Sequence, residues 1–319
     1  MKHSDKGDVM ADGSILAKFS HPHTTQKGDK RAWVPLYQLE TLWLNTGTLC
    51  NIACENCYIE STPTNDALVY LTRNEALPFL QEAKEMGTRE IGITGGEPFM
   101  NPDILAIMQD SLDQGFELLV LTNAMRPMMR PKIQKGLLNI PKDQRAQLTL
   151  RVSMDHYTEE HHDAERGRGA YQRAHEGIKW LHDNGFQLAV AGRSIWGEAE
   201  DEARHGYGQM LRDLGIDLDV KDPKKLVIFA EMRAQDDPPE ITTACWDILG
   251  KTPKDIMCSS ARMVVKRKNA AAPVVLACTL LAYDDRFELG GSLKEASTPV
   301  SLNHKWCATF CVLGGSSCS

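Results

Sequence analysis

"REIGITGGEPFMNPDILAIMQDSLDQGFELLVLTN", residues 89–123, contains one complete strand–helix–strand unit. The run "REIGITG" (89–95) has the apolar, β-branched character of a buried strand, and "FELLVLTN" (116–123) repeats it. Between them "PDILAIMQDSLDQG" (102–115) has the apolar spacing of an amphipathic helix and ends on a glycine. Two parallel strands need a crossover of this kind, so the stretch predicts a βαβ unit.

The same alternation extends in both directions along the chain. Further strands are expected at 41–47, 146–155, 186–192 and 216–220, and further helices at 73–87, 130–140, 171–185 and 202–215. Six strand–helix units predict a parallel sheet with helices on its outer face, either a flat doubly wound sheet or a partial barrel. In both folds the chemistry gathers beyond the C-terminal ends of the strands. The residues at these places are Thr48–Tyr58, Gly95–Pro98, Asn123, Ser153–Asp155 and Arg193.

Composition narrows the classes of partner. The 319 residues carry a formal net charge of -7, which argues against nucleic acid because phosphate binding favours a basic face. No apolar run approaches the ~20 residues of a membrane span, and the first residues lack the apolar centre of a secretory signal. We therefore expect a cytoplasmic protein without nucleic-acid or membrane partners.

The nine cysteines fall into two groups. Three lie at positions 50, 54 and 57, and the others follow only from Cys245 onward, at 245, 258, 278, 307, 311 and 318. Clustered cysteines in a cytosolic protein are more often metal ligands than disulfides, so two separate sulfur sites are expected. After residue 220 the alternation ends, and short strands follow, with Cys258 and Cys278 flanking a hairpin. The predicted parts are a polar N-terminal segment (1–36), an α/β body (37–225) and a small cysteine-containing α+β extension (226–319).

The first group has the spacing C-x3-C-x2-C, which two kinds of metal centre could use. A structural zinc ion wants four ligands, and a remote residue such as Cys245 or His161 would have to supply the fourth. A [4Fe–4S] cluster held by three thiolates instead keeps one iron without a protein ligand, so that iron can bind an exogenous molecule.

Four ordered segments resemble the radical S-adenosylmethionine (radical SAM) superfamily. Cys50, Cys54 and Cys57 with the following Tyr58 match its C-x3-C-x2-C-aromatic signature. "TGGEPFMNPDI" (94–104) is similar to its "GGEP" segment, and "LTNAM" (121–125) to its "TNG" turn, with Ala124 where glycine is usual. The stretch 151–185 resembles its "vSlDG…hD…R…G" region, with His156 in place of a glycine.

This resemblance implies a fold, two cofactors and an activity. The fold would be a partial (β/α)6, TIM-like barrel, with a [4Fe–4S] cluster on Cys50, Cys54 and Cys57. S-adenosylmethionine would chelate the open iron, and an electron would cleave it to a 5′-deoxyadenosyl radical that abstracts hydrogen from the substrate. A flavodoxin or ferredoxin is the kind of electron donor expected. The residues expected to bind S-adenosylmethionine are Tyr58, Gly95, Gly96, Glu97, Asn123, Ser153, Arg166 and Arg193.

The extension resembles the SPASM and twitch domains of the same superfamily. It implies one auxiliary [4Fe–4S] cluster, held by four of Cys258, Cys278, Cys307, Cys311 and Cys318. Its tail spacing, C-x3-C-x6-C, departs from the full SPASM pattern, and zinc is the structural alternative. Cys245 is interpreted first as a buried apolar residue.

The expected function is therefore that of an enzyme, an oxidoreductase or modifying enzyme that abstracts hydrogen from a peptide or a small metabolite. Thr279 follows Cys278 where the sulfatase-maturing branch is expected to have a carboxylate, and no catalytic acid or base is marked. The contrary hypothesis is a non-catalytic zinc or iron–sulfur protein that acts as a scaffold or regulator.

Overall fold

The computed structural model describes residues 17–233 and 235–315. Within this part of the chain nine strands form one sheet in the order β10-β9-β8-β2-β3-β4-β5-β6-β7. Six of them pair in parallel, in the order of the sequence: β2 (Thr41–Asn45), β3 (Glu90–Thr94), β4 (Glu117–Thr122), β5 (Leu148–Ser153), β6 (Gln187–Arg193) and β7 (Leu226–Phe229). The sheet has two ends and is not a closed barrel, which confirms the predicted α/β class.

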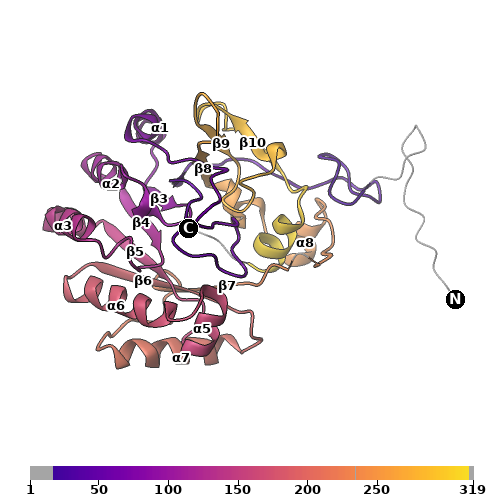
Figure 1. Ribbon diagram of the computed structural model, residues 1–319. Coiled ribbons are helices and arrows are strands. Elements are labelled where there is room, and N and C mark those ends of the chain that lie inside the picture. The colour runs from indigo at the N-terminus through magenta and orange to yellow at the C-terminus, as the bar shows by residue number, and fades with distance from the viewer. Residues whose placement is uncertain (1–16, 234, 316–319) are drawn as a thin grey trace.

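Helices follow the strands and form a layer along the outer side of the sheet (Figure 1). Their bounds are α1 (Arg73–Glu85), α2 (Ile104–Asp113), α3 (Pro131–Asn139), α4 (Lys142–Arg145), α5 (Glu159–Arg166), α6 (Ala170–Asp183) and α7 (Glu200–Asp213). Pro78 lies in the second turn of α1, and the helix continues past it to Glu85. The sequence did not predict α5, which comes to lie beside the site described below.

The sixth parallel strand is not where the sequence placed it. Residues 216–220 were predicted as this strand, but they contain no strand, and β7 begins at Leu226 instead. β7 pairs in parallel with β6, so "LVIF" continues the parallel sheet. The alternation of apolar and acidic residues in "IDLDV" suits a half-buried strand, whereas a parallel strand covered on both faces is a continuous apolar run.

The two faces of the sheet pack into two different cores. Leu42 and Leu44 of β2 join the core beneath the outer helices, while Trp43 between them joins the core on the opposite side. Successive side chains of a strand point to opposite faces, so both faces of β2 are buried. The second core continues into the C-terminal extension, which covers the inner face of the sheet.

The extension adds the strands β8, β9 and β10 to the β2 edge of the parallel sheet. β8 (Ala261–Val265) pairs in parallel with β2 and antiparallel with β9 (Val274–Leu276), and β9 pairs with β10 (Glu288–Gly290). This is the hairpin predicted between Cys258 and Cys278. The other helical segments of the described residues are α8 (Cys245–Leu249), a π-helix at Cys307–Leu313, and short 3₁₀ helices at Pro98–Met100, Pro253–Asp255, Met257–Ser259 and Asp285–Phe287.

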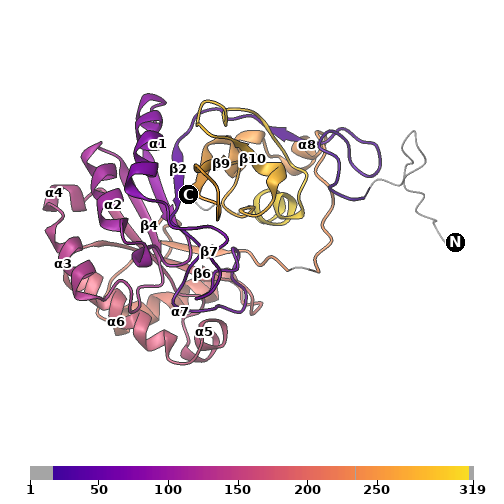
Figure 2. The same cartoon turned by 45° about the horizontal axis from the view of Figure 1, so that its top comes forward.

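The N-terminal segment runs along this extension (Figure 2), where β1 (Trp33–Val34) pairs with β11 (Val300–Ser301). The division at residues 36 and 225 stays a prediction. None of the described helices has the length and apolarity that crossing a membrane would require.

Candidate functional site

A cavity of about 190 Å³ opens beyond the C-terminal ends of the parallel strands. Its walls come from the loop after β2, from the ends of the other parallel strands, and from the extension. The lining residues include Trp43, Cys50, Cys54, Asn56, Cys57, Tyr58, Ile59, Thr94, Gly95, Gly96, Asn123, Ser153, Asp155, Arg166, Arg193, Phe229, Thr279, Leu280 and Phe310. The strand-end position expected for the chemistry is therefore where the structure has its larger cavity.

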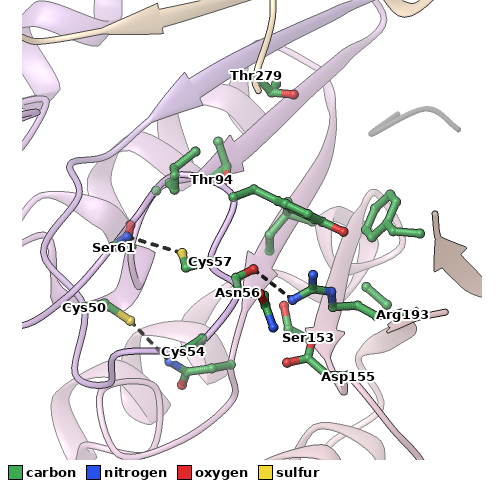
Figure 3. Close-up of a pocket in the computed structure, with 18 of the residues that line it drawn as sticks. Cys50, Cys54, Asn56, Cys57, Ser61, Thr94, Ser153, Asp155, Arg193 and Thr279 are labelled. Atoms are coloured by element: carbon green, nitrogen blue, oxygen red, sulfur yellow. Dashed lines mark hydrogen bonds between the residues drawn. The ribbon is translucent and has the colours of Figure 1, made fainter. Parts of the chain in front are cut away.

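The first three cysteines lie in one loop and line this cavity (Figure 3). The backbone N–H of Ser61 donates to the Cys57 sulfur at 3.3 Å. The amide nitrogen of Asn123 lies 3.9 Å from the Cys50 sulfur. Two sulfur atoms thus already accept hydrogen bonds, which stabilise a thiolate more than a thiol.

Burial makes the thiols of Cys50 and Cys54 poor acids in the absence of a cation. Desolvation is the main cause that raises the pKa of Cys50 to about 12, and the nearby charges of Glu97, Cys54 and Cys57 contribute to the same shift. Desolvation also raises the pKa of Cys54, although the Arg166 guanidinium opposes the shift. A coordinated metal deprotonates a thiol outright, so one buried and two half-buried thiols on one cavity suit a cationic centre.

The three thiols do not form a ready-made site for one ion. No three His, Cys, Asp or Glu side chains in the described ranges are arranged to hold a metal ion. In an iron–sulfur cluster each thiolate binds a different iron, so its ligands surround a volume rather than a point. The cavity beside the thiols provides such a volume, and the donor set fits a [4Fe–4S] cluster.

Gly95 and Gly96 join the end of β3 to the cysteine loop. A Cβ on Gly96 would lie 2.2 Å from the carbonyl oxygen of Leu49, and Gly95 has a φ of +146°. The Gly96 N–H donates to the Gly47 carbonyl at 2.7 Å. Both glycines line the cavity, and their missing side chains let two backbone segments touch beside the cysteines.

Glu97 points into the protein rather than into the cavity. Its carboxylate accepts hydrogen bonds from the Asn123 N–H at 2.8 Å, the Thr122 hydroxyl at 2.9 Å and the Phe99 N–H at 3.2 Å. Burial raises its pKa to about 7, against these three donors. In this arrangement Glu97 connects the ends of β3 and β4, and its expected contact with S-adenosylmethionine stays a prediction.

Both candidate arginines already hold carboxylates. Arg166 donates two hydrogen bonds to Asp155, at 2.7 and 2.9 Å. Burial would raise the pKa of Asp155, but this guanidinium holds that pKa below its usual range. Arg193 donates to the Asn56 carbonyl at 2.8 Å and to Glu231 at 3.1 Å (Figure 3).

The other predicted cofactor-binding side chains gather at the same cavity. Tyr58, Asn123 and Ser153 all line it, and Arg193 lies over the Tyr58 ring, 4.8 Å from its centroid. The roles assigned to them stay predictions, but their shared location does not depend on those roles.

Several residues of the site were not identified from the sequence. Asn56 donates to both oxygens of Glu165, at 2.9 and 3.0 Å, so α5 holds the loop between Cys54 and Cys57. Phe229 and Phe310 line the cavity from β7 and from the π-helix. Their only sequence signal is apolar character, which does not distinguish a cavity wall from an ordinary core.

The later cysteines line a second, small cavity of about 20 Å³. Four of them share it: Cys258, Cys278, Cys307 and Cys311. Burial raises the pKa of Cys258 to about 11 and that of Cys307 to about 12. Cys318 lies outside the described residues. Cys245 is partly buried on α8 and is not among the lining residues of either cavity.

Comparison with known families and proteins agrees with this geometry. The model of the radical SAM superfamily matches residues 44–196. The subtilosin biosynthesis protein AlbA of Bacillus subtilis is 31% identical over 167 residues, covering 52% of this chain and 35% of AlbA. The AdoMet-dependent heme synthase of Methanosarcina barkeri is 32% identical over 142 residues, covering 44% of this chain and 38% of that protein. The chain thus spans just over a third of the length of these relatives.

Solved structures show the same fold at low identity. Streptococcus suis SuiB bound to S-adenosylmethionine has a TM-score of 0.56 at 14% identity, covering 80% of this chain and 63% of SuiB. The enzyme anSMEcpe with bound AdoMet has a TM-score of 0.55 at 12% identity, covering 83% of this chain and 82% of that chain. The expected partial barrel is confirmed by these neighbours. Residues 44–196 thus match the radical SAM superfamily, and the cysteine-containing extension fits the SPASM/twitch-type domains that its sequence resembles.

Proposed function

We propose that the protein is a radical SAM enzyme that abstracts a hydrogen atom from a peptide or a small metabolite. The observation that carries the proposal is the cavity beyond the strand ends. Cys50, Cys54 and Cys57 share it, and these three cysteines lie inside the segment matched by the superfamily model. When bound, a [4Fe–4S] cluster with one open iron supplies the electron that splits S-adenosylmethionine into methionine and a 5′-deoxyadenosyl radical.

The protein's own side chains would hold the reactants and exclude water. Cys50, Cys54 and Cys57 would hold the cluster, and the exposed backbone of Gly95 and Gly96 would border S-adenosylmethionine. Asn123 and Ser153 supply hydrogen-bonding groups suited to its ribose or carboxylate. Tyr58 and Arg193 line the same cavity. The substrate radical forms when a C–H hydrogen of the substrate passes to the 5′ carbon, giving 5′-deoxyadenosine.

The substrate class rests on the names of relatives. AlbA is a bacteriocin biosynthesis protein, and the 27%-identical MftC of Mycobacterium ulcerans is a mycofactocin maturase. Others are heme synthases and GTP 3′,8-cyclases, which act on small molecules. We infer a peptide or small-metabolite substrate, a flavodoxin- or ferredoxin-type electron donor, and a cytoplasmic location.

We also propose one auxiliary [4Fe–4S] cluster. Four buried or half-buried cysteines share the second cavity, and four thiolates complete a cluster. Cys318 is the remaining candidate ligand. Zinc on the same thiolates is the outcome that would replace this part of the proposal.

Anaerobic reconstitution tests both parts. The reduced protein should convert S-adenosylmethionine into 5′-deoxyadenosine and bind about eight irons, four for each cluster. A Cys54→Ala variant should lose the product, and a variant lacking all three early cysteines should keep about four irons. Cys245→Ala is the matched control, because Cys245 is not among the lining residues of either cavity. Wild-type protein that makes no 5′-deoxyadenosine and is unaffected by Cys54→Ala would instead be a metal-binding scaffold.

A further inference from the structure

One wall of the larger cavity is aromatic and uncharged. Phe310 lies between two other rings, with its centroid 5.8 Å from that of Phe229 and 6.4 Å from that of Tyr58. Ile59 of the cysteine loop and Leu280 of the extension also line the cavity. We call Tyr58, Ile59, Phe229, Leu280 and Phe310 the aromatic wall.

Each charged side chain that lines the cavity already has a partner, and Arg193 also lies over the Tyr58 ring, 4.8 Å from its centroid. Asp155 and Arg166 form a bidentate pair, and Arg193 is held by Glu231 and the Asn56 carbonyl. A charged substrate group would compete with one of these buried pairs, unless it accepted a hydrogen bond from the Arg193 Nε–H, which has no partner among the described residues. An uncharged group placed against the aromatic wall breaks none of them.

The second cavity fixes the position of this wall. Leu280 lines both cavities, two residues after Cys278, whose sulfur accepts a hydrogen bond from the Leu280 N–H at 3.3 Å. Phe310 immediately precedes Cys311 in the π-helix and is fully buried. Two chain segments therefore present cysteines to the smaller cavity and apolar side chains to the larger one, so the wall is preorganised.

We propose that the aromatic wall binds an uncharged apolar or aromatic group of the substrate and holds it beside S-adenosylmethionine. This proposal rests on the proposed function, because it specifies the substrate of the same site. The group belongs either to an amino-acid side chain of a peptide or to the ring of a free metabolite. Thr279 is the polar side chain beside the wall, and it adds no charge.

Equilibrium dialysis of the reconstituted full-length protein with S-adenosylmethionine tests the proposal. The apolar probes are p-cresol and N-acetyl-L-phenylalaninamide, and the charged probes are glutarate and N-acetyl-L-lysinamide. The apolar pair should bind more tightly than the charged pair. Tighter binding of the phenylalanine derivative points to a peptide side chain, and tighter binding of p-cresol to a free ring.

Two variants and a control test whether the apolar probes bind at the aromatic wall. Phe310→Ala should weaken binding of the apolar probes roughly tenfold, since it removes a buried ring from the wall. Leu313→Ala, at an exposed position of the same π-helix, should leave binding unchanged. Thr279→Asp places a charge beside the wall with little added volume, so it should weaken apolar binding and favour N-acetyl-L-lysinamide even if Phe310→Ala fails to fold.

Equal affinity for all four probes, or apolar binding unaffected by both cavity variants, would overturn the proposal. Its failure is separable from failure of the proposed function, because dialysis needs no turnover. Binding of the apolar probes without formation of 5′-deoxyadenosine would contradict only the proposed enzymatic function. Formation of 5′-deoxyadenosine without a preference for the apolar probes would contradict only the proposal that the aromatic wall binds the substrate.

Discussion

At the residue scale, buried polar groups around the cavity are held by contacts from other parts of the chain. Glu97 accepts three hydrogen bonds, and Asp155 is chelated by Arg166. A buried polar group without such partners costs free energy, so these contacts fix the strand ends where they meet the cysteine loop. Two substitutions test how closely the site depends on single residues.

Gly96→Ala should displace the cysteine loop. The added Cβ would lie 2.2 Å from the Leu49 oxygen and 2.7 Å from the Thr48 oxygen, which are backbone atoms with little freedom to move. We expect a loss of about 1–3 kcal/mol in the free energy of unfolding, typical of overpacking, together with reduced iron binding. Urea unfolding and iron analysis measure the two effects. Gly291→Ala is the control, because the nearest atom to its Cβ would be a side-chain oxygen 3.9 Å away.

His162 should make the protein sensitive to mild acid. The side chain is fully buried, and among the described residues neither ring nitrogen has a hydrogen-bond partner. Burial, helped by the charge of Arg166, lowers its pKa from 6.5 to about 3. Below pH 6.5 the His162 side chain therefore binds a proton in the unfolded chain but not in the folded protein. The free energy of unfolding falls as the pH drops from 6.5 toward 3.

The His162→Phe variant isolates this effect. Between pH 7 and pH 5 the wild type should lose about 2 kcal/mol more than the variant in the free energy of unfolding, as followed by urea unfolding. The groups facing the ring are Arg166 and Asp163 on α5, Asp155 after β5, and Tyr171 and His175 on α6. They are the same in both proteins, as is Glu97, whose raised pKa acts in the opposite direction. A His182→Gln control at an exposed position should behave as wild type, and equal acid losses in all three proteins would contradict the prediction.

At the element scale, α5 is the support of the cysteine loop. Its Glu165 accepts two hydrogen bonds from Asn56, and its backbone carbonyl accepts one from Glu55 at 2.9 Å. The same carboxylate lies 3.5 Å from Arg193. One short helix thereby connects the loop between Cys54 and Cys57 to the end of β6.

Glu165→Ala should loosen that loop without unfolding the sheet. Losing a buried, charge-assisted acceptor costs about 1–3 kcal/mol locally, which corresponds to roughly ten- to a hundredfold faster amide exchange for residues 54–58. Hydrogen-exchange mass spectrometry provides the measurement. Glu160→Ala, on an exposed face of the same helix, should not change exchange in the loop. Unchanged exchange in the Glu165 variant would show that α5 is not the support.

The strands and helices also show how much of the fold could be predicted from the sequence. Five of the six body strands and the long helices were predicted, because each has a periodic apolar pattern bounded by glycine or a polar cap. The sixth strand was misplaced because "IDLDV" matches the pattern of an exposed strand, and only pairing with β6 identifies "LVIF". The cysteines and glycines were found through their spacing. Glu165 and Phe310 were not, since only the fold brings them within reach of residues more than 100 positions away.

At the scale of the whole molecule, the N-terminal segment connects separate parts of the extension. β1 pairs with β11, and the Ala32 N–H donates to the Ile241 carbonyl at 2.9 Å. Arg31 is fully buried beneath this segment and donates to Glu240 at 2.5 Å. It also donates to three backbone carbonyls, those of His21, Thr24 and Leu302. The segment predicted only as polar is thus, from residue 17 onward, part of the folded extension.

Arg31→Ala should therefore release the N-terminal segment from the extension. Removing one partner of a buried ion pair leaves the other charge uncompensated and costs about 3–5 kcal/mol. The carboxylate of Glu240 would keep its hydrogen bonds from the Phe19 and Gln26 N–H groups, which limits the loss to the lower part of that range. Urea unfolding measures the cost, and hydrogen exchange should rise in residues 33–34 and 300–301 while β3 and β4 stay protected. Lys30→Ala is the matched control, since Lys30 is the exposed basic neighbour. If exchange rose equally in β3 and β4, Arg31 would stabilise the whole sheet rather than the junction between the N-terminal segment and the extension.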